Sequence, residues 1–261
     1  MESKSLSTGG RVVLVGAGPG DPGLLTLKAA DALLHADVIV HDGLVDDEIL
    51  AMARPAARRI SVAKSRSRHS VPQSGINQIL IDEARAGNFV IRLKGGDPFI
   101  FGRGGEEVEA CRAAGITVEV IPGISAALGA SAEALLPLTH RDVSSAVSFV
   151  AGQCKGLSDQ DWSGLAGKGR TLVIYMGVAT ADDIADKLIA DGVSPDMSVA
   201  VLERGTRTGA RAIRTLLTDL GGIIVREKVK SPAIIIVGDV VLRSDALDRL
   251  ATLAHQSRAI L

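Results

Sequence analysis

The sequence predicts an α/β fold, and two observations lead to this prediction. Apolar, β-branched segments of strand length alternate with longer segments in which apolar residues recur at helical spacing. The strand segments are apolar almost throughout, which is typical of a sheet covered on both faces. Strands that alternate with helices in this way form mainly parallel sheets with right-handed crossovers.

Each element of the first half follows from this pattern. A buried strand is expected in RVVLVGAG because its β-branched run is continuous. An amphipathic helix is expected at 24–36, and Gln73 to Ala86 is expected to be helical, with Gly87 fitting its C-cap. The remaining expected elements are strands at 37–42, 59–63, 89–94 and 117–122, a short helix near 46–52 and a helix at 105–114.

The same pattern restarts in the second half, after a helix at 122–134 and a connector at 135–142. The elements expected there are strands at 146–153, 171–177, 198–203, 211–216 and 233–239 and helices at 180–190 and 217–227. We place a domain boundary in the connector. Residues 1–10 are then a flexible tail, 11–136 an N-terminal α/β domain and 137–261 a C-terminal α/β domain.

Composition narrows the function. A formal net charge of −1 and an aromatic content of 2% argue against a nucleic-acid partner, which requires a basic surface or stacking side chains. No apolar run approaches the ~20 residues of a membrane-spanning helix, and the polar N-terminus lacks the apolar middle of a signal peptide. Cys111 and Cys154 form no disulfide framework, and Cys111 is expected in the core. We therefore expect a cytoplasmic protein without a membrane partner.

Basic residues are concentrated in one segment of the first half. They are Arg54, Arg58, Arg59, Lys64, Arg66, Arg68 and His69. A solvated face and a docking surface for an anionic small molecule explain this cluster equally well.

The most informative segment is Arg92 to Glu106, RLKGGDPFIFGRGGE. It follows an expected strand and precedes an expected helix, so it forms a loop at the C-terminal end of a strand, where ligands bind in open α/β sheets. Its glycines allow the backbone to approach a ligand closely. Asp97 supplies an acceptor, and Lys94 and Arg103 supply cationic donors. A Gly-rich turn with a helix-capping acid is the alternative.

A second glycine loop, GAGPGDPG, follows the first strand. The dinucleotide fingerprint G-x-G-x-x-G fails here because Asp21 occupies the third glycine position. Pro19 and Pro22 also interrupt the start of a helix, whose free amides a pyrophosphate requires. A rigid loop beside a ligand fits better.

The motifs VGAGPGDP, RLKGGDPFIFGRGGEE, VIPGISAA, LPLTHRD and YMG occur in this order, and the likeness continues to SPAIIIVGDVV. With them the chain resembles the tetrapyrrole methylase family, and most closely those members that convert uroporphyrinogen III to precorrin-2. The resemblance implies the class III S-adenosylmethionine methyltransferase fold, in which a ligand cleft lies between two α/β domains.

The resemblance also implies a set of contacts with the methyl donor S-adenosylmethionine, and no metal. The donor contacts are Pro19, Gly95, Gly96, Asp97, Ile100, Ser125, Ala126, Met176 and Gly205. Glycine backbone can bond the adenine and the amino-acid tail, Asp97 can accept from ribose hydroxyls, and Met176 offers adaptable apolar surface. Core packing for Met176 and a helix cap for Ser125 are the structural alternatives.

The implied reaction is the methylation of uroporphyrinogen III at two ring carbons, C-2 and C-7, through precorrin-1. Alignment of donor and carbon is the main task of the protein, and a base then removes a proton from the ring. Asp42, just past an expected strand, aligns with the proposed acceptor in the family, and Lys64 with the proposed donor. Turn capping and surface exposure are their respective alternatives.

The macrocycle is rich in carboxylates, so a basic lining is expected. The candidates are Arg66, Arg68, His69, Lys94, Arg103, His140 and Arg141, of which His140 could equally be a packed connector residue. The chain departs from the common family pattern at His41-Asp42-Gly43, where relatives often have Tyr-Asp-Arg. It departs again at Ala63-Lys64-Ser65, where they often have Gly-Lys-Arg. Each departure removes a cation near the substrate.

Other functions remain open at this stage. They are methylation of a later corrin precursor, modification of a macromolecule, and a non-catalytic nucleotide-binding module. Because only a short segment precedes the first strand, we expect a single-function enzyme, and family habit implies a homodimer. The sequence leaves open whether the product enters sirohaem biosynthesis, cobalamin biosynthesis or both.

Overall fold

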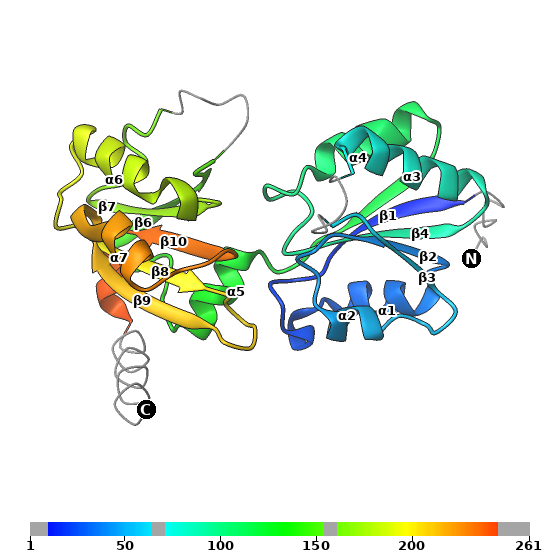
Figure 1. Cartoon of the computed structure of the whole chain (residues 1–261), viewed down its shortest axis with the longest axis horizontal. Helices are drawn as coiled ribbons and strands as arrows, with labels where there is room; N and C mark the ends of the chain where they lie inside the picture. Colours follow the sequence, from blue (N-terminus) through cyan, green and yellow to red (C-terminus); the bar gives the residue numbers. More distant parts are fainter. Residues whose placement is uncertain (1–9, 64–70, 154–160, 245–261) are drawn as a thin grey trace. The chain divides into compact units, whose positions relative to one another are not determined.

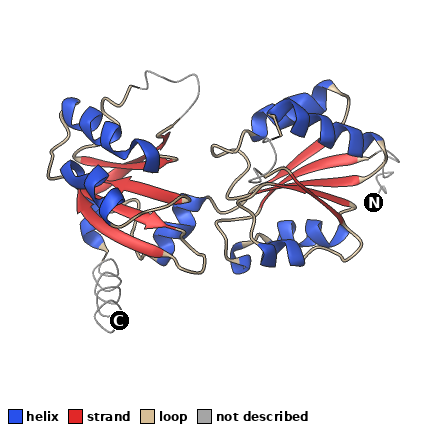
Figure 2. Cartoon of the chain, viewed as in Figure 1, coloured by secondary structure: helices blue, strands red, loops and turns tan. Residues whose placement is uncertain are grey.

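A computed structural model describes residues 10–63, 71–153 and 161–244, and these divide into two compact units, Met1–Ala126 and Ala127–Leu261. The expected tail, apart from Gly10, lies outside the described residues, as do Lys64, Arg66, Arg68, His69 and Cys154. Strands and helices alternate in the first unit, as the sequence pattern predicts, and both kinds of element also make up the second unit (Figure 2).

The first unit is built on a five-stranded sheet in the order β3-β2-β4-β1-β5. All its pairings are parallel. The strands are β1 (Arg11–Gly16), β2 (Val38–His41), β3 (Arg58–Ser61), β4 (Phe89–Lys94) and β5 (Thr117–Ile121). Parallel strands bring their carboxyl ends to one edge, so the loops after β1, β2, β4 and β5 gather there.

Helices cover both faces of this sheet (Figure 1). They are α1 (Leu27–His35) and α2 (Asp47–Ala51) on one face and α3 (Gln73–Arg85) and α4 (Gly104–Ala113) on the other. Alternate residues of β1 pack into the two cores, Val13 and Val15 into one and Val12 and Leu14 into the other. This two-sided burial explains why the strands are apolar throughout.

Local capping sets the helix boundaries. The helix expected at 24–36 begins only at Leu27, where the Thr26 hydroxyl accepts from Ala29 N at 3.1 Å. Pro22–Leu24 forms a separate 3-10 turn, and Asp21 accepts from Gly23 N at 2.7 Å. The loop after β1 therefore leads into a 3-10 turn and not directly into an α-helix. A dinucleotide-binding loop needs the direct start of a helix, so its exclusion is confirmed. Cys111 is fully buried, as expected.

The second unit is built on a mixed sheet in the order β6-β7-β10-β8-β9. The strands are β6 (Ser144–Ala151), β7 (Gly169–Tyr175), β8 (Ser198–Glu203), β9 (Arg211–Leu216) and β10 (Ala233–Val237). Only β6 and β7 pair in parallel, and the other pairings are antiparallel.

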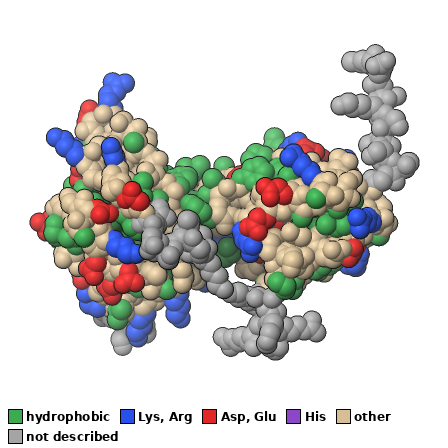
Figure 3. Space-filling view, turned by 90° about the horizontal axis from the view of Figure 1, so that it is seen from above, with side chains coloured by type: hydrophobic (Ala, Val, Ile, Leu, Met, Phe, Trp, Pro, Cys, Tyr) green, Lys and Arg blue, Asp and Glu red, His purple; other side chains and the backbone are tan. Residues whose placement is uncertain are grey.

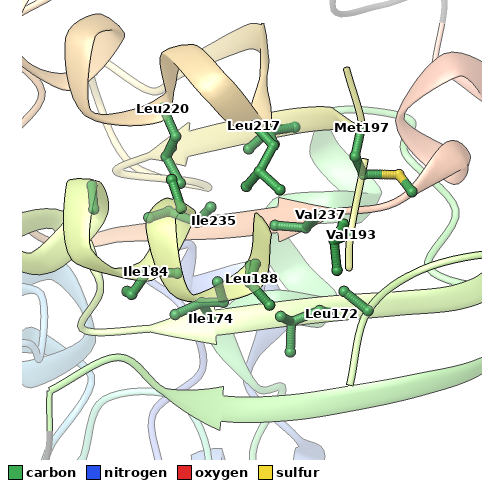
Figure 4. Packing of buried hydrophobic residues seen from close by; sticks show 14 of the residues in the cluster. Leu172, Ile174, Ile184, Leu188, Val193, Met197, Leu217, Leu220, Ile235 and Val237 are labelled. Carbon is green, nitrogen blue, oxygen red and sulfur yellow. The ribbon is translucent and has the colours of Figure 1, made fainter. Parts of the chain in front are cut away.

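Helices α6 (Ala181–Ala190) and α7 (Leu220–Arg226) pack on one face of this second sheet. Figure 4 shows Ile184 and Leu188 of α6 directed toward Leu172, Ile174 and Ile235 of the strands. The strands and helices expected in this half are therefore all present, including the strand at 211–216.

The division between the units falls after Ala126, ahead of the boundary expected at 136. Contacts made by helix α5 (Ala126–Glu133) account for this difference. Ala127 N donates to the Tyr175 hydroxyl at 3.2 Å, and the Ser244 hydroxyl donates to Ala134 O at 2.7 Å. These hydrogen bonds join α5 to β7, and the residue that follows α5 to the C-terminal part of the second unit.

Acidic and basic side chains are interspersed on the face seen in Figure 3, in keeping with the near-neutral net charge. Within the described ranges, no helix is both long enough and apolar enough to cross a membrane.

Candidate functional site

The two glycine loops of the first unit are joined to each other at the carboxyl ends of β1 and β4. Gly96 N donates to Gly18 O at 2.7 Å, and Gly18 N donates to Gly96 O at 3.2 Å. Both residues have positive φ, +73° for Gly18 and +69° for Gly96, a conformation that glycine adopts without steric cost. The loops that the sequence identifies separately are thus one structure.

The loop after β5 also packs closely against these two loops, with main chain against main chain. A Cβ atom on Gly16 would lie 2.5 Å from both Cα and N of Gly123 and 2.7 Å from Gly96 O. No side chain fits at Gly16 because the opposing atoms belong to the backbone and cannot rotate away. Three glycines from three strand ends therefore fix the spacing of the loops.

Asp97 ties the loop after β4 to the loop after β5. One carboxylate oxygen accepts from Phe99 N at 2.8 Å, and the other accepts from Gly123 N at 3.0 Å. The first bond caps the local turn, which is the alternative that the sequence left open. The second joins two strand ends, which a simple turn does not do. A carboxylate has about four acceptor positions, so both oxygens retain capacity for a ligand donor.

The other predicted donor contacts of the first unit surround this framework. Pro19 and Ser125 are buried, and Ala126 is half-buried at the start of α5. A Cβ on Gly96 would meet Ala126 N at 3.6 Å, an ordinary van der Waals distance. Ile100 is 36% exposed and lies between the exposed rings of Phe99 and Phe101, so the loop beyond Asp97 presents an apolar surface.

Asp42 lies at the end of β2, beside β4 in the sheet. Its Oδ1 accepts from Leu44 N at 2.9 Å, and its Oδ2 accepts weakly from Gly95 N at 3.4 Å. The carboxylate therefore caps its own turn and also approaches the glycine loop. The half-buried side chain retains acceptor capacity, as the proposed base requires.

The two departures from the family pattern lie against each other. A Cβ on Gly43 would be 3.1 Å from Ala63 Cβ, tighter than ordinary packing. A glycine at 43 thus leaves room for an alanine at 63.

Lys94 is not the accessible cation that a basic lining calls for. Its side chain is 4% exposed, and Nζ lies 3.1 Å and 3.2 Å from the two carboxylate oxygens of the fully buried Glu107. Burial lowers the pKa of Lys94 and Arg92 lowers it further, whereas Glu107 and Asp42 raise it. Lys94 is directed into the layer between the sheet and α4, because alternate residues of β4 face opposite sides.

Other cations of the first unit are paired with carboxylates. Arg103 is exposed and bound to Glu106 through two hydrogen bonds of 2.8 Å and 2.7 Å. Of the basic cluster, Arg54 pairs with Asp37, and Arg58 pairs with Glu83. The described members of the cluster thus include structural ion pairs, whereas four predicted substrate or catalytic residues (Lys64, Arg66, Arg68, His69) fall outside the described ranges.

In the second unit, predicted site residues follow strand ends with unusual backbone. Met176, just after β7, is 48% exposed with φ +55°, so core packing does not explain it. Gly205 follows β8 between Arg204 and Thr206, which both have positive φ. A side chain at Gly205 would overlap Ala130 of α5. Strained backbone of this kind is typical of functional sites.

His140 and Arg141 lie in the turn before β6. His140 N and O pair with Ser144 O and N, each at 2.9 Å, and its Nδ1 accepts from Asp142 N at 3.3 Å. This arrangement corresponds to the connector role that the sequence left open for His140. Arg141 is exposed.

The sequence analysis did not predict the buried ion pairs that Arg92 and Lys94 form with Glu107. The available signal was a pair of cations, at 92 and 94, at alternate positions of an otherwise apolar strand. Alternation places both on one face, which needs a buried counter-charge.

The family of the chain follows from its similarity to known proteins. The model of the Tetrapyrrole (Corrin/Porphyrin) Methylases matches residues 11–221. Siroheme synthase 2 of Cronobacter sakazakii is 51% identical over 246 residues, covering 94% of this chain and 53% of the relative. Siroheme synthase 3 of Aeromonas hydrophila is 52% identical over 241 residues, covering 92% and 51%. The chain spans about half the length of the curated relatives it matches.

A solved structure matches over nearly the full length of both chains. Uroporphyrin-III C-methyl transferase from Thermus thermophilus, complexed with S-adenyl homocysteine, is 40% identical with a TM-score of 0.77. The alignment covers 89% of this chain and 93% of that chain. With the family model extending across both units, the chain belongs to the tetrapyrrole (corrin/porphyrin) methylase family.

Proposed function

We propose that this chain is an S-adenosylmethionine-dependent C-methyltransferase that converts uroporphyrinogen III to precorrin-2 through precorrin-1. The observation that carries the proposal is the backbone framework of Gly16, Gly18, Gly96 and Gly123 at the carboxyl edge of the first sheet. The Thermus thermophilus relative, whose structure contains the demethylated donor, adds support.

The residues at this edge suit the methyl donor chemically. Backbone at Gly95 and Gly96 has no side chain of its own to exclude a ligand, and Asp97 has acceptor capacity for hydroxyl or ammonium groups. Ile100 offers exposed apolar surface for an adenine. Pro19, Ser125 and Ala126 in the first unit, and Met176 and Gly205 in the second, complete the proposed donor contacts. No metal is needed for this set of contacts.

When bound, the donor supplies an electrophilic methyl group for in-line transfer to a ring carbon. The contribution of the protein is alignment, which can lower a barrier by roughly 7–11 kcal/mol in ideal cases. The methylated ring must then lose a proton. We assign Asp42 as the base that accepts this proton, and Lys64 as the proposed proton donor. Arg66, Arg68, His69, Arg103, His140 and Arg141 remain proposed partners for substrate carboxylates.

The deciding experiment is an anaerobic incubation of the protein with isotope-labelled S-adenosylmethionine and uroporphyrinogen III. We expect mass spectrometry to detect a product with two added methyl groups, and NMR of that product to place them at C-2 and C-7. Donor binding without transfer would instead favour a non-catalytic module. Transfer only to an already methylated corrin precursor would favour the sister reaction.

Replacing Asp42 with asparagine is expected to lower kcat by roughly 10²-fold, the lower end of a general-base contribution. Asparagine keeps an oxygen that can accept from Leu44 N, so the turn and donor affinity should persist. Asp46→Asn is the matched control, since Asp46 caps α2 through Glu48 N in the same loop. Steady-state kinetics and titration with the methyl donor would measure kcat and donor affinity for both variants. An unchanged kcat in Asp42→Asn would remove Asp42 from the mechanism.

Family habit supports two further proposals, a cytoplasmic location and a homodimer. The names of the curated relatives favour sirohaem biosynthesis as a destination of the product, and supply to cobalamin biosynthesis is equally compatible with the chemistry.

A further inference from the structure

Three charged side chains are buried beneath the loop that follows β4. The side chains of Arg92 and Lys94 are each 4% exposed, and that of Glu107 is fully buried. Charged residues are almost never this deeply buried unless they are paired. Two cations share one carboxylate here.

Glu107 organises the cluster. Its Oε1 accepts from Arg92 Nε at 2.9 Å, from Lys94 Nζ at 3.2 Å and from Gln73 Nε2 at 3.2 Å. Its Oε2 lies 3.1 Å from Lys94 Nζ. Arg92 is also fixed to the main chain, donating to Val40 O at 3.3 Å and to Leu93 O at 3.1 Å. Arg92 therefore has partners apart from Glu107, whereas Glu107 is the partner of the Lys94 ammonium among the residues that the structure describes.

Lys94 connects this cluster to both glycine loops. Its carbonyl accepts from Ala17 N at 2.8 Å, and the next residues are Gly95 and Gly96. A Cβ on Gly102 would lie 3.2 Å from Lys94 Cε and 2.7 Å from Pro98 O. The loop from 97 to 104 is thus folded closely over the Lys94 side chain, which forms its floor.

Stability alone does not account for such a cluster, because well-packed apolar side chains often serve as well as a buried ion group. We propose that Glu107 is a positioning residue that, by holding Lys94, fixes the segment 95–102 where its backbone can bind the methyl donor, an inference that rests on the proposed function. Lys94 then acts from beneath the loop and not as a substrate ligand.

Two variants test this role. Glu107→Gln keeps the shape but removes the charge, and Lys94→Met removes the ammonium while leaving Arg92 and Glu107 as a neutral pair. The matched control is Glu83→Gln in α3, which loses an ion pair with Arg58 in the same unit but away from the loop. Lys94→Met keeps the test valid if Glu107→Gln fails to fold, because it leaves no unpaired buried cation.

The affinity for S-adenosylhomocysteine, measured by calorimetry below the unfolding temperature of each variant, is the first readout. We expect Glu107→Gln and Lys94→Met to bind S-adenosylhomocysteine at least about tenfold more weakly, because small displacements of positioning groups have effects of this size. Glu83→Gln should bind it normally. Hydrogen exchange of the segment 95–104 without ligand is the second readout, and it should be faster in the two variants alone.

The outcomes separate the two proposals. If the wild-type protein binds the ligand and folded Lys94→Met binds it equally well, with unchanged exchange, the positioning role is overturned and the proposed function stands. If the wild-type protein does not bind the ligand at all, the donor site itself is wrong and the positioning role falls with it. A purely structural role predicts altered melting without altered affinity.

Discussion

Gly16→Ala is expected to destabilise the protein by roughly 3 kcal/mol or more and to abolish measurable donor binding. The added methyl group would meet Cα and N of Gly123 at 2.5 Å and Gly96 O at 2.7 Å. All three atoms belong to main chain, so the loops after β1, β4 and β5 must separate to admit it. That separation would also strain the pairing between Gly18 and Gly96, on which the proposed donor site depends.

Urea denaturation and calorimetric titration with S-adenosylhomocysteine would measure both effects. Gly105→Ala is the control, since a Cβ there meets no atom within 4 Å and the residue lies in α4. Alanine in a helix is favoured over glycine by roughly 0.5–1 kcal/mol, so this control should be slightly stabilised with normal binding. A Gly16→Ala protein as stable as wild type would show that the loops are not held at this spacing.

Asp97→Ala is expected to weaken S-adenosylmethionine binding by about 100-fold, equivalent to roughly 2.7 kcal/mol. The substitution removes the acceptor for Phe99 N and for Gly123 N, and each unsatisfied amide costs about 1–3 kcal/mol if it stays buried. It also removes the carboxylate proposed to accept from the ligand. Losing the bonds to the two amides together with the ligand contact should weaken binding more than losing either alone.

Asp161→Ala provides the comparison, because Asp161 caps an exposed turn of the second unit through Ser163 N at 2.9 Å and joins no strand ends. Calorimetric titration should give wild-type affinity for this variant. Wild-type affinity in folded Asp97→Ala would remove Asp97 from the donor site and leave it with its structural bonds to Phe99 N and Gly123 N.

The sequence predicted the elements of both units closely, because periodicity and capping are local properties. Continuous apolar runs identified β1 and β8, and Gly87 marked the end of α3. Strand direction was less accessible. The run at 233–237 looks like any buried strand, yet β10 pairs antiparallel with both of its neighbours. An apolar run reports burial and carries no information on orientation.

The boundary between units shows the same limit. The connector at 135–142 resembles a linker in composition, but α5 is joined to Tyr175, and Ala134 just after it to Ser244, far along the chain. Such long-range hydrogen bonds depend on which surfaces meet after folding. No local pattern encodes them.

For the candidate site, the sequence by itself located the residues, because glycine loops at strand ends and an acid at position 97 can be identified in the printed residues. Only the tertiary structure decided which of these groups contact one another. It joined Gly18 to Gly96, braced Asp97 against Gly123 and buried Lys94 on Glu107. The physical reason is that a cation in a sequence has no partner until packing supplies one, and burial then determines whether it faces a ligand or supports the loop that does.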